Sequence, residues 1–585
     1  MIKGLSHWDL TSVEKPARYL GGEWNQAAPK PDARLSVCLG FPDLYDLGMS
    51  NLALKILYGL LDADPRIAVE RVFSPWVDFE ELLRRKNIPL YGLESKRPLH
   101  AFDILGITLP YEMTFTNVLR MLELGGIPLL GSERTSGPLV IAGGPSAANP
   151  LPVADFFDAI LIGDGEEALP ELCDRVISWK IVGGEHHPHG RNELLESIST
   201  IEGFWVPRFP KPVKRRVFKG FGASTPPLHP IIPNVETVHN RIPLEIFRGC
   251  MQGCRFCNSG YFYRPRRDRM PHALIENAER LMRNTGDEGI GLLSLSTSDY
   301  GCLNELITGL VARRVYPDQN LTVPSLRMND ATLELLKRDD QIKKSGLTFA
   351  PEAGSQRLRN VIGKNITEED ILRVIEATSE SYYQTVKLYF MIGLPFETDS
   401  DIDAIAELVG KIDGAAKRMK LRKELSISLS PFVPKPFTPF QWSGQLPAEE
   451  LQARRIRVTS ALKRVRAKVS WREEFLCGLE AVLARGDQRV GKLLLAAHRK
   501  GCRFDGWGEQ FRRGSWEESL KETGLTVAEF ARERPLNEPL PWDFVDFRTP
   551  RAFLEGEYRR AAEAAGVAEV AGATEVPGVV VGGPL

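Results

Sequence analysis

Two long sections of the chain alternate short apolar runs with amphipathic segments, and this alternation restricts the fold more than any other feature. The first section spans residues 34–180 and the second spans residues 241–445. Continuous apolar runs predict strands buried on both faces, and the amphipathic segments between them predict the helices that cover the sheet. Strands connected through helices run parallel. The sequence therefore predicts an α/β protein with two parallel sheets.

The first section is predicted to form a Rossmann-like domain. Glycines follow two of its strands, as Gly143 and Gly144 and as Gly163 and Gly165, at the carboxyl edge where open α/β sheets bind ligands. They suit either a cradle for a nucleotide tail or phosphate, or tight turns that need a positive φ. The predicted strands are 34–41, 103–110, 138–145 and 158–165, and the predicted helices are 50–61, 115–126 and 166–179.

The second section is predicted to form a partial TIM-type (β/α)6 barrel. Six strand–helix repeats are fewer than the eight that close a TIM barrel, so we expect an open one. Thr367 and Asp370 have the spacing of a capping box and predict the start of a helix. The predicted strands are 243–249, 289–296, 321–328, 346–352, 385–393 and 424–432.

The remaining segments lack this alternation. Residues 1–33 form an N-terminal extension, and 181–240 are rich in proline and turn formers, which predicts a linker with a short β-hairpin. His186, His187 and His189 lie in this linker, where an exposed loop explains them better than a metal site. Beyond residue 446 we expect no further strands: 446–561 are predicted to be helical, and 562–585 to be a disordered tail.

Composition excludes several classes of protein. Eight cysteines in 585 residues are too few for a disulfide scaffold and suit a reducing cytoplasm. The chain begins without an apolar segment of signal-peptide length and contains no apolar run long enough to span a bilayer. A net charge of −1 gives no overall attraction to nucleic acid or anionic lipid. We therefore expect a cytoplasmic protein with no membrane partner.

Three of the eight cysteines lie together, as Cys250, Cys254 and Cys257, directly after a predicted strand. Their spacing is C-x3-C-x2-C, and thiolates are the usual ligands of iron–sulfur clusters. A cubane takes four ligands, so three local ones leave one iron open. The alternative is zinc, which structural sites enclose with four protein ligands, but the sequence offers no second C-x2-C and no suitably spaced histidine pair.

With Phe256 before its last cysteine, this loop resembles the defining loop of the radical S-adenosylmethionine (SAM) superfamily. The resemblance implies a [4Fe–4S] cluster on Cys250, Cys254 and Cys257, with SAM chelating the open iron. It further implies that one electron, from a donor such as flavodoxin or ferredoxin, splits SAM into methionine and a 5′-deoxyadenosyl radical. Such a cofactor supplies the chemistry while the protein orients it.

Further positions match the pattern of this superfamily, in order and on the expected strands. By resemblance, two of them contact the amino group of SAM, three bind its carboxylate and ribose, and two pack near its adenine. These are respectively Ser298 and Asp299; Arg327, Glu352 and Ser355; and Gly393 and Pro395.

The first domain resembles the cobalamin-binding domain that precedes some radical SAM barrels. The usual cobalamin loop carries a histidine that binds cobalt, whereas the first strand here is followed by FPDLYDLGMS, without histidine. Two alternatives stay open: cobalamin bound without a protein axial ligand, or a degenerate domain kept for its shape.

The substrate and the bond formed stay undetermined. A methylthiotransferase is disfavoured, because such enzymes hold a second cluster on three N-terminal cysteines and only Cys38 and Cys173 lie there. A second cluster from Cys302, Cys477 and Cys502 is not required, since isolated cysteines are usually buried thiols. Methyl transfer and the modification of RNA or of a small molecule remain open reactions.

Two other functional classes compete with a radical enzyme. One is a non-catalytic iron–sulfur protein that transfers electrons or senses redox state. The other is an RNA-binding protein, suggested by a basic segment that equally fits a solvated charged face. Its cationic residues are Arg454, Arg455, Arg457, Lys463, Arg464, Arg466 and Lys468.

Overall fold

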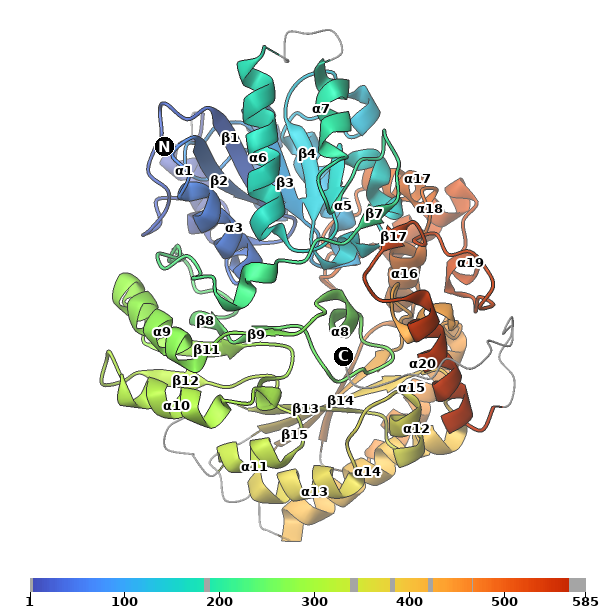
Figure 1. Ribbon diagram of the computed structural model, residues 1–585. Helices are drawn as coiled ribbons and strands as arrows, with labels where there is room; N and C mark the ends of the chain where they lie inside the picture. The colour runs from blue at the N-terminus through green and yellow to red at the C-terminus, as the bar shows by residue number, and fades with distance from the viewer. Residues whose placement is uncertain are drawn as a thin grey trace.

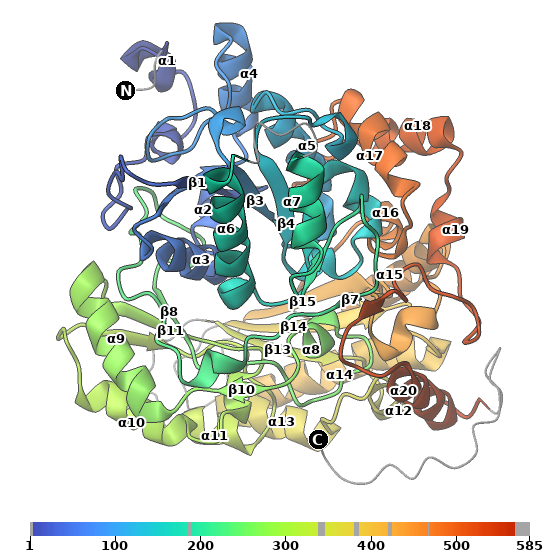
Figure 2. The same ribbon diagram turned by 45° about the horizontal axis from the view of Figure 1, so that its top comes forward.

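The computed structural model describes residues 4–183, 190–336, 346–378, 385–418, 424–465 and 467–567. A Rossmann-like domain forms one end of the molecule and a half-barrel of parallel strands forms the other (Figures 1 and 2). Helices from the C-terminal part of the chain run along one side of both. The predicted α/β fold is therefore confirmed.

The first sheet has the strand order β2-β1-β3-β4-β5-β6, which is the doubly wound flavodoxin-like order with one strand added. Its first five strands are parallel and β6 is antiparallel to β5. Every residue of β1 is buried, as expected for a strand covered on both faces. The strands are β1 (Leu35–Phe41), β2 (Ile67–Phe73), β3 (Ile104–Thr108), β4 (Leu139–Gly143), β5 (Ala159–Leu161) and β6 (Phe204–Trp205).

Part of the predicted linker belongs to this domain, which corrects its assignment. Helix α7 (Gly190–Ile198) packs against α6, and β6 extends the sheet. The predicted hairpin is absent from the described part of this segment, because β7 (Val213–Lys214) pairs instead with the distant β17 (Val545–Asp546). His186, His187 and His189 lie outside the described residues. The other helices are α1 (His7–Thr11), α2 (Tyr45–Gly48), α3 (Leu52–Asp62), α4 (Val77–Lys86), α5 (Phe115–Leu124) and α6 (Gly165–Ile181).

The half-barrel consists of two parallel sheets with the orders β12-β11-β8 and β13-β14-β15-β16. All six predicted strands are present, but the third is shorter than predicted, because Pro324 cannot donate to a ladder. The prediction that strands stop at 446 is wrong: β16 pairs with β15 as a seventh strand. The strands are β8 (Ile242–Glu245), β11 (Gly289–Leu293), β12 (Asn320–Thr322), β13 (Leu347–Glu352), β14 (Thr385–Ile392), β15 (Glu424–Pro431) and β16 (Ala467–Trp471).

Helices connect these strands and cover their outer face (Figure 1). The predicted capping box is confirmed, since Thr367 and Asp370 bond to each other's backbone N–H at the start of α13. The helices are α8 (Asn258–Phe262), α9 (Pro271–Thr285), α10 (Leu303–Ala312), α11 (Asp330–Leu336), α12 (Gln356–Val361), α13 (Glu368–Ala377) and α14 (Asp399–Arg418). Two short strands, β9 (Phe247–Arg248) and β10 (Arg267–Asp268), pair antiparallel beside them.

The C-terminal region is mostly helical, as predicted. Its last helix extends into the segment 562–585 that was predicted to be disordered, and residues 568–585 lie outside the described residues. The helices are α15 (Ala448–Leu462), α16 (Glu474–Arg485), α17 (Val490–Arg499), α18 (Arg513–Thr523), α19 (Val527–Ala531) and α20 (Arg551–Ala564).

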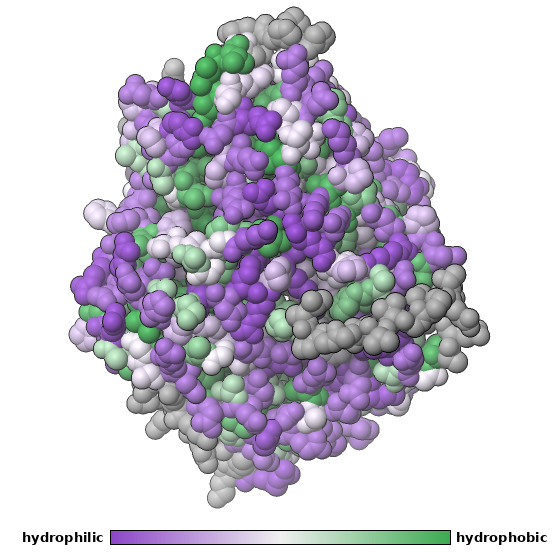
Figure 3. Space-filling view, in the orientation of Figure 1, coloured by the Kyte–Doolittle hydropathy of each residue, from purple (hydrophilic) through white to green (hydrophobic). Residues whose placement is uncertain are grey.

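One hydrophobic core runs through the Rossmann-like domain and into the C-terminal region, where it includes Trp516 and Trp542. Two smaller cores lie beneath the two sheets of the half-barrel. On the face drawn in Figure 3, hydrophilic residues predominate and hydrophobic ones are scattered among them. No helix in the described ranges combines the length and apolar character that a membrane crossing requires.

Candidate active site

The three clustered cysteines lie on one loop between β9 and α8. Each is partly exposed, whereas Cys38, Cys173, Cys477 and Cys502 are buried. The loop begins at Gly249, whose φ of +95° favours glycine. A side chain there would meet the carbonyl oxygen of Tyr263 at 2.7 Å, so the chain can turn here only without a Cβ. The loop thus leaves the strand at its carboxyl end, where catalytic loops of α/β barrels lie.

The last thiol of this loop is fixed by the helix that follows it. Cys257 caps α8, and its Sγ accepts a hydrogen bond from the Gly260 N–H at 3.4 Å. Burial raises the pKa of Cys254, and it raises the pKa of Cys257 to about 12. Metals bind the thiolate, so metal binding at this loop must release protons.

The donor set suits a cluster better than a single ion. Within the part of the chain that the structure describes, no three His, Cys, Asp or Glu side chains are grouped so as to hold one metal ion. A [4Fe–4S] cluster is larger and is held by separate cysteine thiolates. Three partly exposed thiols on one loop fit such a cluster, with one iron left for another ligand.

Arg255, between the second and third cysteines, clamps the loop from two sides. Its backbone N–H donates to the Ile362 carbonyl at 2.9 Å. Its side chain donates to the carbonyls of Asn360 at 3.0 Å and Val361 at 2.7 Å. Its Nε also pairs with Glu557 on α20 at 3.0 Å. The turn after α12 and the C-terminal helix therefore both fix the cysteine loop.

The residues after β11 and β12 lie next to the cysteine loop. Asp299 accepts a hydrogen bond from the Gln252 amide at 2.7 Å, which joins it to that loop. Ser298 is buried, and its Oγ accepts from the Arg327 N–H at 3.0 Å. Three of the predicted SAM-contacting residues are thus brought to one edge, together with Gln252, which the sequence analysis did not identify.

Glu352 ends β13 with a φ of +68°, and its carboxylate lies 3.5 Å from the Lys364 ammonium. Burial raises the pKa of Glu352 even though Lys364 opposes this shift. Lys364 and Arg327 also lie near enough to lower the pKa of Cys254, against the larger effect of burial. Lys364 belongs to no motif and was therefore missed from the sequence.

The other predicted positions contact neighbouring elements. Ser355 caps α12 by accepting from the Leu358 N–H at 3.0 Å and donates to Asp401. Gly393 has a φ of +76°, and its N–H donates to Glu397 at 2.7 Å. Pro395 is half-buried after β14, and Phe256 packs partly buried against the main core. Their roles toward SAM stay predictions.

A cavity of about 460 Å³ lies between the carboxyl edge of the Rossmann-like sheet and the start of the half-barrel. The Rossmann side contributes Gly106, Gly143 and Gly163, and the barrel side contributes Arg248 and Tyr263. None of the described residues that line it is His, Cys or Met. These lining residues would offer a cobalt ion no histidine, which agrees with both alternatives for this domain.

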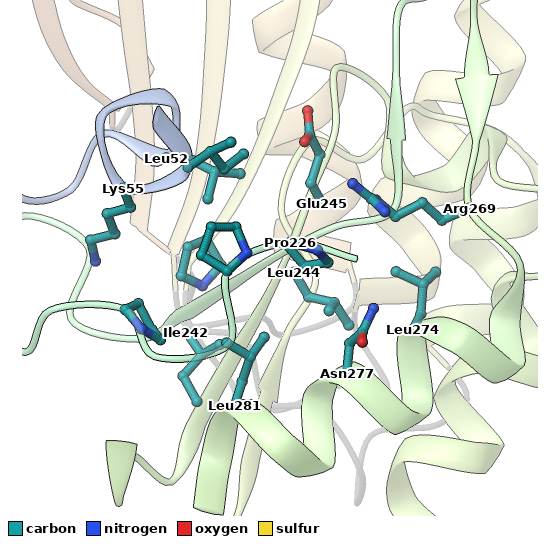
Figure 4. A pocket seen from close by; sticks show the side chains of 14 residues that line it. Leu52, Lys55, Pro226, Ile242, Leu244, Glu245, Arg269, Leu274, Asn277 and Leu281 are labelled. Carbon is teal, nitrogen blue, oxygen red and sulfur yellow. The ribbon is translucent and has the colours of Figure 1, made fainter. Parts of the chain in front are cut away.

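A smaller cavity of about 40 Å³ adjoins it and shares Leu52, Ile56 and Glu245 with its lining. Figure 4 shows this space between Leu52 on α3 and Leu281 on α9, with the carboxylate of Glu245 directed away from Leu281. It has room for water but not for a drug-sized ligand. The larger cavity is therefore the candidate for a ligand.

Arg248 joins the two domains beside the larger cavity. Its guanidinium contacts Glu245 at 3.0 Å, and Asp164 and Glu166 of the Rossmann-like domain at 3.2 and 2.8 Å. Arg267 also donates to Asp164, at 2.6 Å. Burial alone would raise the pKa of Asp164, but these two arginines hold it below its usual value. Because Arg248 is followed by Gly249 and Cys250, this joint fixes the start of the cysteine loop.

Four of the seven cations in the basic segment around α15 have acidic partners. Arg454 pairs with Glu397, and Arg455 pairs with Glu474. Arg457 contacts Asp403 at 2.7 Å. Lys468 likewise pairs with Glu424, and Arg466 lies outside the described residues. These four cations are less available to phosphates than unpaired ones would be.

Comparisons with known proteins match both the Rossmann-like domain and the half-barrel to family models. The model of the radical SAM superfamily matches residues 244–409, and that of the N-terminal domain of radical SAM proteins matches residues 53–207. An uncharacterised protein of Methanocaldococcus jannaschii is 28% identical over 78% of this chain and 90% of its own length. A tRNA-2-methylthio-N(6)-dimethylallyladenosine synthase of Anaplasma phagocytophilum is 26% identical over 36% of this chain and 47% of its own length.

Solved structures of two enzymes also align with this chain. The radical SAM methyltransferase TsrM of Kitasatospora setae, with cobalamin and a [4Fe–4S] cluster bound, is 16% identical over 71% of this chain and 76% of that one, with a TM-score of 0.47. The cobalamin-dependent radical enzyme OxsB, with aqua-cobalamin and SAM bound, is 12% identical over 91% of this chain and 79% of that one, with a TM-score of 0.45.

Proposed function

Since this chain belongs to the radical SAM superfamily, we propose that the enzyme cleaves SAM reductively at a [4Fe–4S] cluster held by Cys250, Cys254 and Cys257. The observation that carries the proposal is the loop itself: three partly exposed thiols at a carboxyl strand edge, clamped by Arg255 from two elements. The cluster and SAM, when bound, supply a one-electron cleavage of a carbon–sulfur bond.

The residues of this chain then have positioning roles. Gln252 and Asp299 hold the cysteine loop against the strand edge after β11. Ser298, Asp299 and Arg327 are placed to meet the amino acid part of SAM, and Glu352 its ribose. The Lys364 ammonium beside Glu352 keeps positive charge near Cys254, which favours a thiolate there.

Glu352, Ser355, Gly393 and Pro395 complete the proposed SAM site along the edges of β13 and β14. Ser355 acts indirectly in this proposal, because its hydroxyl already caps α12 and bonds Asp401. The Gly393 N–H already donates to Glu397, so in this proposal Gly393 matters because it has no side chain that would occupy the site. The site is thus built by several strand ends, as is usual for barrel enzymes.

RNA is not the substrate that the structure favours. Three tRNA-modifying relatives cover 29–55% of this chain, and four of the seven cations of the predicted basic segment have acidic partners. Nucleic-acid binding depends on cations that are free to replace the counterions of phosphates. A small-molecule substrate agrees better with this charge distribution.

The test is SAM cleavage by anaerobically reconstituted protein. Dithionite replaces the natural electron donor, such as flavodoxin or ferredoxin, and 5′-deoxyadenosine is measured by mass spectrometry. We expect 5′-deoxyadenosine from the wild type and none above background from Cys254→Ala. Cys302→Ala is the matched control, because Cys302 is an exposed thiol outside the C-x3-C-x2-C motif. A fully loaded cluster that forms no 5′-deoxyadenosine contradicts the proposal and favours a redox or sensor protein.

A further inference from the structure

The cavity of about 460 Å³ between the Rossmann-like sheet and the half-barrel lies beside the cysteine loop and has no role in the proposed SAM cleavage. It lies at the carboxyl edge of the Rossmann-like sheet, with lining residues from β1, β3, β4 and β5, and its volume is within the usual range of about 300–1,000 Å³. Arg248 and Gly249, which directly precede Cys250, line it. A molecule bound here lies next to the proposed cluster.

Two glycines, Gly106 and Gly143, line the Rossmann side of this cavity, although the backbone conformation at these positions does not require glycine. A Cβ on Gly143 would lie 3.8 Å from Leu161, and one on Gly106 would lie 3.4 Å from Leu39. Both are ordinary contacts, and neither glycine has a positive φ. Both residues are partly exposed although they lie on central strands. A side chain here would therefore fill the cavity rather than disturb the fold.

The polar groups around the cavity do not suit an anion. Asp164, Glu166 and Glu245 line it, against the single cation of Arg248. The Nε of Arg248 and both its terminal nitrogens already contact these three carboxylates. A phosphate would lose its water beside carboxylates, with no free guanidinium to replace it.

We propose that this cavity binds the substrate of the enzyme, and that the substrate is a mainly apolar small molecule, neutral or cationic, with no phosphate inside the cavity. The inference rests on the proposed SAM cleavage and adds the substrate class to it. Leu39, Ile107 and Leu161 supply the apolar walls, and the Tyr263 ring closes the barrel side. This contradicts the alternative that the glycines at this edge cradle a phosphate.

The test uses three fluorescent probes that share one ring system: naphthol, naphthylmethylamine and naphthyl phosphate. They are titrated into the reconstituted wild-type protein. We expect the neutral and cationic probes to bind about tenfold or more tightly than the phosphate, because the phosphate alone is both desolvated and repelled by the carboxylates. In Gly143→Leu their affinity should fall about tenfold or more, since the added side chain fills the site. Gly514→Leu, on an exposed helix position with open space, is the control.

Each other result contradicts the proposal. Equal or tighter binding of the phosphate shows an anion site, and unchanged affinity in Gly143→Leu, or the same loss in Gly514→Leu, places the probes elsewhere. Hydroxocobalamin that displaces the probes assigns the cavity to a corrinoid. Gly143→Ala fills less space and should give a smaller loss, so it serves if the leucine variant does not fold. The wild-type 5′-deoxyadenosine assay is run in parallel, so that failure of SAM cleavage is told apart from failure at the cavity.

Discussion

The Rossmann-like domain has two joints with the rest of the chain, and both contain buried aspartates that are held in different ways. At the joint with the half-barrel, Asp164 is held by the cations Arg248 and Arg267. At the joint with the C-terminal region, Asp505 accepts from the Thr116 hydroxyl at 2.6 Å and the Trp516 indole at 2.8 Å. Asp164 therefore has cationic partners, whereas the hydrogen-bond donors to Asp505 are neutral.

Asp43 also lies at the joint with the C-terminal region. It follows β1, in the loop where the resembled cobalamin domain has a histidine, and accepts from Tyr111 at 2.6 Å and from Trp507 at 3.0 Å. Burial raises the pKa of both Asp43 and Asp505, whereas the pKa of Asp164 is lowered by its arginines. Asp164, beside the cysteine loop, therefore stays ionised, and the joint with the C-terminal region contains the carboxyl groups of Asp43 and Asp505, which bind protons more readily.

Arg248→Met should give the largest effect, because it removes the charge that joins the two domains. Three carboxylates lose their contacts with Arg248, and breaking a buried ion pair by removing one partner costs about 3–5 kcal/mol. We expect a lower melting temperature and a lower iron content after reconstitution, since Arg248 precedes Cys250. Calorimetry and iron analysis measure the two effects.

The matched control for this substitution is Arg283→Met. Arg283 pairs with Glu279 at 3.0 Å on α9, but its side chain is 63% exposed, and such pairs contribute about 0–1 kcal/mol. Equal losses in the two variants, or a stable Arg248→Met protein with full iron content, contradict the role given to the ionised joint.

Trp507→Phe should have a smaller effect, at the second joint. An aromatic ring is retained, but Asp43 keeps only Tyr111 and the Leu44 N–H as donors, and a hydrogen bond to a charged group contributes about 1.5–3 kcal/mol. We expect a lower melting temperature with an unchanged iron content, because this joint does not contact the cysteine loop directly. Trp8→Phe, at a residue that is 81% exposed, should change neither quantity. Loss of iron in Trp507→Phe with an unchanged melting temperature is the contrary result.

The sequence predicted the features that depend on local pattern. Buried strands such as β1 are continuous apolar runs, and the three cysteines lie within eight residues, so both can be recognised without the fold. Strand β2 was missed because Glu70 and Arg71 interrupt its apolar run. The fold accommodates Arg71 through Glu23 at 3.0 Å and Glu94 at 2.7 Å, which no local pattern shows.

The surroundings of the cysteine loop could not be predicted, because they form between distant parts of the chain. Arg255 meets Glu557, 302 residues away, and Arg248 meets Asp164, 84 residues away. Lys364 reaches Glu352 only because α12 folds the chain back between them. Position in a motif therefore identifies the ligands of such a site, and the tertiary fold identifies what holds them.

The smallest effect we predict is a pH dependence at Asp505. Burial raises the pKa of Asp505 to about 6, above its ordinary value near 3.9. The folded chain therefore holds this proton where the unfolded chain has lost it, and stability from this group falls as pH rises from about 4 to about 6. Between pH 5 and pH 7 the change is on the order of 1 kcal/mol.

Asp505→Asn removes this titration, so the wild type should gain stability relative to the variant as pH falls from 7 to 5. Melting temperatures of both proteins at the two pH values measure the gain. Taking the difference between the proteins removes the contribution of other groups that titrate in this range, such as Glu397, whose pKa burial raises to about 7. A difference that does not change with pH means that Asp505 stays ionised when folded. The two joints then do not differ in how they hold a carboxylate, since the neutral donors of Thr116 and Trp516 suffice to keep the charge.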